Sequence, residues 1–106
     1  MPFRVGLAIC LLAAAAGLPL TSAQATPAAE LQRGQRLLGQ YQCGACHRIP
    51  GVVAATSSLA TPLDGFGKRS YIAGRLANRP ALLAQWIAAP QSLVPGTAMP
   101  DMGVTP

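Results

Sequence analysis

The sequence of 106 residues predicts a small all-α domain. Residues 27–46 carry apolar side chains at the three-to-four spacing of an amphipathic helix. Residues 70–77 and 80–89 are two shorter candidate helices, and the second begins with a proline that suits a first helical turn. No segment alternates apolar and polar residues convincingly enough to predict a strand. These observations together favour short helices joined by loops.

Residues 1–25 have the pattern of a cleavable secretory signal peptide. The basic Arg4 precedes an apolar run over residues 5–20, and residues 23–25 give the small-x-small cleavage pattern. The run is shorter than the roughly 20 residues that cross a bilayer, which disfavours the alternative of an uncleaved anchor. We therefore expect residues 26–106 to form one exported, periplasmic domain with no stable membrane span after cleavage.

The composition of this domain provides few bulky side chains for a hydrophobic core. Residues 26–106 contain one Trp, two Tyr and one Phe, and domains of this size usually supplement the core with a disulfide, a metal or a cofactor. The domain contains seven Arg and Lys residues and three Asp and Glu residues, which gives a net charge of +4. Such a surface attracts acidic partners. The basic residues are dispersed and no nucleic-acid motif is present, so nucleic acid is an unfavoured partner.

The segment between the first helix and the second also has a distinctive composition. Residues 49–68 are rich in Pro, Gly, Ser and Thr without a sustained period, which predicts a long ordered loop. A loop of this length in a small domain is expected mainly where it wraps something. The tail, residues 91–106, is also predicted to be loop.

Three chemically reactive side chains gather in the stretch QCGACHRIP: Cys43, Cys46 and His47, the chain's one histidine. On a helix, positions i, i+3 and i+4 share a face. Two thiols can add across the two vinyl groups of a porphyrin, with the imidazole beneath the iron. C-x-x-C-H is the pattern of c-type haem attachment. A haem would also fill the core and give the loop a surface to wrap.

Three other interpretations of this stretch are weaker. A zinc site needs about four ligands, and residues 26–106 hold no further Cys or His, because Cys10 lies in the signal peptide. A thioredoxin-type dithiol follows a strand in a βαβ pattern, which is missing here. A disulfide between Cys43 and Cys46 would close too short a loop to stabilise a fold much.

The motifs CGACHRIPG, TPLDGFGKR, YIAG, WIAAP and PGTAMPDMG occur in this order, and with them the chain resembles the class I cytochromes c of bacterial periplasms over residues 30–106. The resemblance implies a cytochrome c-like fold around one covalently attached haem c. It implies His47 as the proximal iron ligand and Met99, followed by proline, as the ligand on the other side. Met102 is the competing sulfur ligand. A Met/His pair suits electron transfer.

The same resemblance implies further contacts with the haem and its ligand. The Pro62 carbonyl would accept the ring N–H of His47, although Thr61 stands where the family has glycine. Arg69 and Trp86 would bind the haem propionates, since both side chains are donors suited to carboxylates. The alternatives for these two are a solvated arginine and a core tryptophan. Further candidates for the pocket lining are Tyr71 and Asn78.

One departure from the family concerns the end of the chain. Class I cytochromes c finish with a helix that crosses the first one, and nothing follows Pro106 in this sequence. The expected final helix is therefore missing, and the apolar face of residues 31–41 loses its partner. A truncated chain, a second protein that supplies the helix, or a loosened domain would each explain this.

The expected function is electron transfer by a haem iron that cycles between ferric and ferrous states. We expect no catalytic residues and no enzymatic activity, because His47 and Met99 would saturate the iron. The expected partners are redox proteins with acidic docking surfaces. One alternative is a ligand-binding or sensor haem protein, or a weak peroxidase, with an open distal site. Another is a cytochrome subunit of a larger respiratory or dehydrogenase complex.

Overall fold

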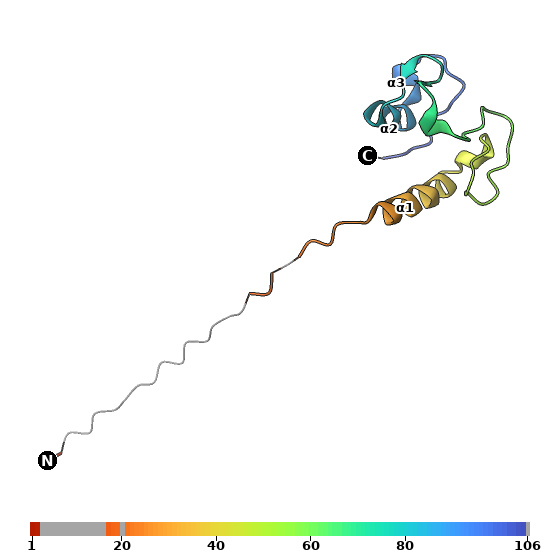
Figure 1. The fold of residues 1–106 in the computed structure, drawn as a ribbon. Coiled ribbons are helices and arrows are strands. Elements are labelled where there is room, and N and C mark those ends of the chain that lie inside the picture. Colours follow the sequence, from red (N-terminus) through yellow and green to blue (C-terminus); the bar gives the residue numbers. More distant parts are fainter. Residues whose placement is uncertain (3–16, 20, 106) are drawn as a thin grey trace.

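The computed structural model of the chain describes residues 1–2, 17–19 and 21–105 (Figure 1). The predicted signal peptide therefore lies mostly outside the described residues. In those ranges, no helix is long and apolar enough to span a membrane. The elements, in chain order, are α1 (Pro27–Gln40), η1 (Cys43–Ala45), η2 (Phe66–Lys68), β1 (Tyr71–Ile72), β2 (Leu76–Ala77), α2 (Pro80–Ala88) and α3 (Pro90–Leu93), where η marks a 3₁₀ turn.

Helix α1 begins and ends at recognisable signals. The Thr26 side chain accepts a hydrogen bond from the backbone N–H of Ala29 at 3.2 Å, and a proline occupies the first turn. The helix stops at Gln40, and Gln42 has a left-handed φ of 55°. The prediction of one helix through residue 46 was therefore wrong at its C-terminal end, because a residue with positive φ cannot continue a right-handed helix.

Much of the α1 surface is exposed. No residue of the helix is buried, and the Leu31 side chain is 73% exposed. One side of α1 lies along the following loop, since a Cβ placed on Gly39 would lie 4.0 Å from Val52 Cγ1. Residues 51–53 of the loop thus lie beside the polar face of α1, which carries Gln32, Gln35 and Arg36, and not beside its apolar face.

The predicted helix at residues 70–77 was wrong, because this segment is an antiparallel hairpin. Its turn has positive φ at both central residues, 50° at Ala73 and 68° at Gly74, and the Arg75 N–H donates to the Ile72 carbonyl at 3.0 Å. Two such residues form the turn that matches strand twist. The cross-strand pairs are Tyr71 with Ala77 and Ile72 with Leu76. The molecule is thus helical with one short sheet.

The predicted helix at residues 80–89 is confirmed as α2, which ends one residue earlier. Pro90 does not simply terminate it, because this residue begins the short helix α3 inside the predicted tail loop. Figure 1 shows α2, α3 and the hairpin grouped together, with α1 on the other side of the loop that joins them. The loop prediction for residues 49–68 is confirmed except for the 3₁₀ turn η2.

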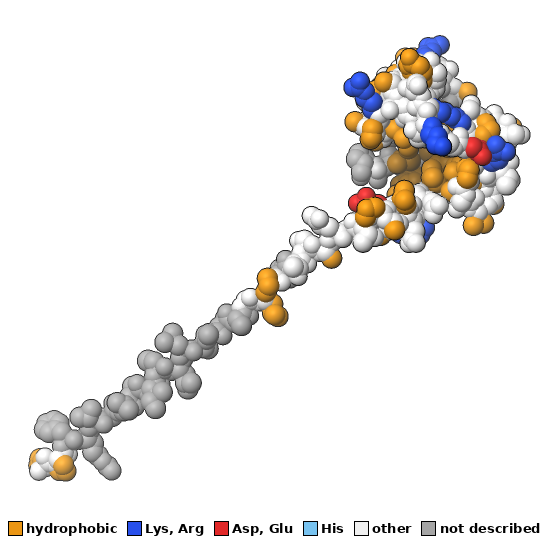
Figure 2. All heavy atoms as spheres, viewed as in Figure 1, with side chains coloured by type: hydrophobic (Ala, Val, Ile, Leu, Met, Phe, Trp, Pro, Cys, Tyr) orange, Lys and Arg blue, Asp and Glu red, His pale blue; other side chains and the backbone are white. Residues whose placement is uncertain are grey.

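The core is small. Its buried side chains come from the loop, the hairpin, α2 and α3: Ile49, Ala55, Ile72, Trp86 and Pro90. Figure 2 shows further hydrophobic side chains in the hollow between α1 and the group of elements above it. The sparse supply of bulky residues in the sequence therefore corresponds to few fully buried positions and a hollow with apolar walls.

Candidate functional site

The reactive stretch forms a single turn directly after α1. The N–H groups of Cys46 and His47 both donate to the Cys43 carbonyl, at 3.3 and 3.0 Å. Both thiols are free and half-buried. Although the α-helix ends before this point, the 3₁₀ turn keeps the two thiols and the imidazole within one short segment.

Close packing against the loop fixes the shape of this turn. A Cβ on Gly44 would lie 2.6 Å from Ala55 Cβ and 2.7 Å from Ala55 Cα, so the two backbones meet where only glycine fits. Ala55 is 3% exposed, and its carbonyl accepts from the Ile49 N–H at 3.0 Å. The loop therefore folds back onto the turn between the two cysteines.

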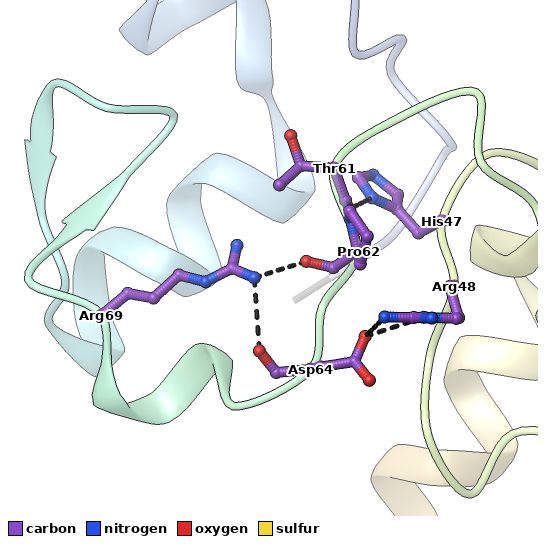
Figure 3. Close-up of polar contacts among 6 residues, drawn as sticks. All are labelled: His47, Arg48, Thr61, Pro62, Asp64 and Arg69. Carbon is purple, nitrogen blue, oxygen red and sulfur yellow. Dashed lines mark hydrogen bonds and ion pairs between the residues drawn. The ribbon is translucent and has the colours of Figure 1, made fainter.

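The His47 ring is oriented by a backbone carbonyl. Its Nδ1 lies 2.6 Å from the Thr61 carbonyl oxygen, as Figure 3 shows. A carbonyl only accepts, so Nδ1 carries the hydrogen and donates it. Nε2 then holds the lone pair that a metal ligand needs.

The predicted acceptor for this bond was wrong by one residue. The sequence predicted the Pro62 carbonyl, whereas His47 binds the Thr61 carbonyl and the Pro62 carbonyl accepts from the Arg69 guanidinium. Arg69 occupies the position that the ring was expected to use, and the ring pairs with the preceding peptide group. No signal in the sequence distinguished these two neighbouring carbonyls.

Residues 60–64 run alongside residues 46–48. The Ala60 N–H donates to the Cys46 carbonyl at 2.8 Å, and the Leu63 N–H donates to the Arg48 carbonyl at 2.9 Å. The Arg48 side chain reaches Asp64 Oδ2 from both Nε and Nη2, each at 3.0 Å. Backbone and side-chain bonds thus join two segments that are distant in sequence.

Arg69 takes part in this same network. Its Nη2 donates to the Pro62 carbonyl at 2.5 Å and lies 3.3 Å from the Asp64 carbonyl (Figure 3). The guanidinium also lies over the Phe66 ring, 5.5 Å from its centroid. Arg69 is therefore engaged with protein groups and is not simply solvated. Its predicted contact with a propionate stays a prediction.

Asn78 positions the segment that carries Arg69. Its half-buried side-chain amide donates to the carbonyls of Phe66 at 3.0 Å and Arg69 at 2.9 Å. In the sequence analysis this residue was only a candidate for the pocket lining. Tyr71, the other such candidate, is 59% exposed in the hairpin.

Trp86 and Met99 lie in other parts of the molecule. Trp86, in α2, is 8% exposed and belongs to the core, which was one of its two sequence interpretations. Met99 is half-buried in the segment after α3. Within residues 21–105, no hydrogen bond joins the Met99 segment to the Cys43–Arg69 network.

One glutamine holds the Met99 segment. The Gln91 amide donates to the carbonyls of Thr97 at 2.6 Å and Met99 at 3.4 Å, and its oxygen accepts from the Gly96 N–H at 2.9 Å. Sequence reasoning missed this role, since an exposed glutamine in a segment predicted to be a loop carries no pattern. Thr61 and Asp64 were missed in their roles for the same reason.

Partial burial raises the pKa of the Cys43 thiol, and a backbone hydrogen bond opposes this more weakly. In the described part of the chain, no group of three or more His, Cys, Asp and Glu side chains gathers to hold a metal ion.

Comparison with known proteins gives one match. A stretch of 68 residues is 37% identical to cytochrome c oxidase subunit 2 of Alkalihalophilus pseudofirmus. The match covers 64% of this chain and 19% of that relative, so the chain spans about a fifth of the relative's length. That protein is a subunit of an oxidase, which is consistent with the expectation that this chain is not itself an enzyme. No family model and no solved structure matches the chain.

Proposed function

We propose that residues 26–106 are a haem c-binding, electron-transfer module of the class I cytochrome c type in an exported respiratory protein. Cys43 and Cys46 bind the haem covalently, and His47 and Met99 ligate its iron. The observation that carries the proposal is the turn of two free thiols and one imidazole, in which Nδ1 donates to Thr61 and Nε2 keeps its lone pair.

The residues present fit such a group. The donor set, two thiols three residues apart and an adjacent imidazole, is that of c-type haem attachment. The side chains of the hollow beside α1 are hydrophobic, which suits an apolar macrocycle (Figure 2). When bound, the haem supplies an iron that exchanges single electrons between its ferric and ferrous states.

The protein's own groups would set the properties of that iron. The Thr61 carbonyl holds the His47 ring in one orientation and makes the imidazole a stronger ligand. The Met99 sulfur would be the second ligand, and a thioether ligand would favour the reduced state and raise the potential. The family resemblance implies that Arg69 and Trp86 contact the haem propionates. In the structure, the Arg69 guanidinium donates to the Pro62 carbonyl, so Pro62 would act through this contact with Arg69.

The match to an oxidase subunit supports a respiratory setting. A net charge of +4 for residues 26–106 favours encounter with a partner of acidic surface. The exposed apolar side chain of Leu31 on α1 supports a place within a larger assembly, where a partner covers it. The signal-peptide pattern of residues 1–25 supports the proposal of a periplasmic or otherwise exported location.

The proposal is tested on protein that is exported together with a haem-maturation system. Denaturing gel electrophoresis with haem staining reports covalent attachment, and absorption spectra of the ferric and ferrous forms report the ligands. We expect one haem per chain, a low-spin ferric spectrum with a sulfur-to-iron band, and a low-spin ferrous spectrum that carbon monoxide leaves unchanged on mixing. A matured protein without covalent haem contradicts the proposal.

The identity of the sulfur ligand has its own matched pair of variants. We expect Met99→Ala to abolish the sulfur-to-iron band and Met102→Ala to preserve it. Both methionines are half-buried in the same segment, so the two variants have comparable effects on packing. The opposite pattern would assign the iron to Met102.

A second candidate function follows from the way in which the Met99 segment is held. Because its hydrogen bonds are local and involve Gln91, a haem protein in which this segment opens would bind small gaseous ligands. Binding of carbon monoxide to the reduced wild-type protein, without denaturant, would favour this sensor function over electron transfer.

A further inference from the structure

The backbone segment that accepts a hydrogen bond from the His47 ring accepts another one from its opposite side. Figure 3 shows His47 and Arg69 approaching the Thr61–Pro62 backbone from opposite directions. His47 donates to the Thr61 carbonyl at 2.6 Å, and Arg69 donates to the next carbonyl, that of Pro62, at 2.5 Å. Two consecutive peptide groups thus bind the proposed ligand and a guanidinium.

The peptide group between Pro62 and Leu63 is fixed at both ends. Its carbonyl accepts from Arg69, and its N–H donates to the Arg48 carbonyl at 2.9 Å. The peptide groups are planar and the proline ring fixes its own φ. Only the ψ angle of Pro62 therefore remains free between this anchored plane and the plane of the Thr61 carbonyl.

Arg69 is itself held by other groups of the protein. The Asn78 amide binds the Arg69 carbonyl at 2.9 Å and the Phe66 carbonyl at 3.0 Å. The guanidinium also lies over the Phe66 ring, at 5.5 Å from its centroid. The side chain is thus directed at the Pro62 carbonyl by a segment that is fixed on both sides of η2.

From this arrangement we propose that Arg69 is a positioning residue for His47. It anchors the Pro62 carbonyl, and the Thr61 carbonyl thereby stays oriented to accept the Nδ1 hydrogen. The inference rests on the proposed function, in which His47 ligates a haem iron, and adds a role for Arg69 that differs from a propionate contact. The predicted consequence is a firmly held Nδ1–H bond.

The test measures that bond in the haem-containing protein. In the reduced, diamagnetic state, NMR follows the exchange of the Nδ1 hydrogen of His47 with solvent. We expect Arg69→Ala to accelerate this exchange by about fivefold to tenfold, the effect of losing one hydrogen bond near the surface. Arg69→Lys, which keeps one donor, is expected to show a smaller acceleration and guards against misfolding of the alanine variant.

Arg75→Ala is the matched control. Arg75 lies exposed in the hairpin turn, and its removal deletes the same charge without touching residues 60–64. We expect less than a twofold change in exchange for this variant. Both Arg69→Ala and Arg75→Ala remove a positive charge, so both should change the reduction potential of the haem. Only Arg69→Ala should change the exchange rate of the His47 Nδ1 hydrogen.

Two results overturn the inference. One is an Nδ1–H exchange rate that Arg69→Ala and Arg69→Lys leave unchanged. The other is a change confined to the NMR signals of the haem propionates, which would assign Arg69 to those groups. Failure of the proposed function looks different, since the wild-type protein would then carry no covalent haem at all.

Discussion

The two sides of the proposed site are supported in different ways. The His47 side is cross-linked across the sequence, with bonds from residues 46–48 to residues 60–64 and from Arg69 to the same segment. The Met99 side is held through bonds that span only a few residues, most of them to Gln91. One proposed ligand, His47, belongs to a network of bonds, and the other, Met99, belongs to a locally held loop.

This difference has consequences for motion. Local opening costs least where a segment has few buried contacts and exposed hydrogen bonds. The side-chain bonds are exposed on both sides, but only the His47 turn packs on the buried Ala55, which is 3% exposed, and is joined by backbone bonds to residues 60–64. The structure therefore predicts that the Met99 side opens first and the His47 side last.

The largest effect is expected from Gly44→Ala, which should destabilise the packing on the His47 side. The new Cβ would lie 2.6 Å from Ala55 Cβ and 2.7 Å from its Cα, so the backbone must shift, at a cost of about 3 kcal/mol. Gly34→Ala is the control, because a Cβ in α1 meets nothing within 4 Å and should stabilise the helix by up to ~1 kcal/mol. Urea unfolding measures both, and equal midpoints would refute the packing argument.

A smaller effect is expected from Gln91→Ala, which should loosen the Met99 side. The variant removes the bonds to the Gly96 N–H and to the Thr97 and Met99 carbonyls, and we expect about a tenfold rise in the carbon monoxide binding rate of the reduced haem protein. Gln85→Ala, on the exposed side of α2, is the control. If the two variants bind the gas alike, Gln91 does not hold the segment.

A still smaller effect is expected from Arg48→Ala. The ion pair with Asp64 joins side chains that are 56% and 46% exposed, and such surface pairs contribute about 0–1 kcal/mol. We expect a loss in that range at low ionic strength that shrinks in 1 M salt, because salt screens exposed charges. The backbone bonds of the same segment should persist. A larger, salt-independent loss would show that Arg48 acts through packing.

The smallest effect concerns the Cys43 thiol of protein made without haem. Burial raises its pKa, so the thiolate needs a higher pH in the folded than in the unfolded chain. The associated contribution to stability is present below the unfolded pKa and is lost as pH rises through the folded one. Alkylation of Cys43 in a Cys46→Ser variant should show a higher midpoint pH in buffer than in guanidinium. Coincident midpoints would indicate that the turn does not form without haem.

The sequence predicted features that depend on local signals. The Thr26 cap and the prolines of α1 and α2 act within one turn, so both helix starts were predictable. The hairpin was missed because its strands have two residues each, too few for an alternating pattern, and the turn depends on positive φ at Ala73 and Gly74.

The site itself was predictable only in part. Cys43, Cys46 and His47 form a contiguous motif whose chemistry is evident from its spacing. The choice between the carbonyls of Thr61 and Pro62 depends on how the backbone turns and on the reach of Arg69. These are tertiary properties, and periodicity and motif spacing contain no information about them.

The position of a proline after Thr61 provides a built-in spectroscopic label. The Thr61 carbonyl belongs to a tertiary amide, which has no N–H and so nothing to exchange in heavy water. Its carbonyl vibration therefore keeps its frequency on deuteration, while those of ordinary peptide groups shift. With carbon-13 at Thr61, infrared difference spectroscopy would read the strength of the bond from His47 Nδ1 directly in the oxidised and the reduced protein.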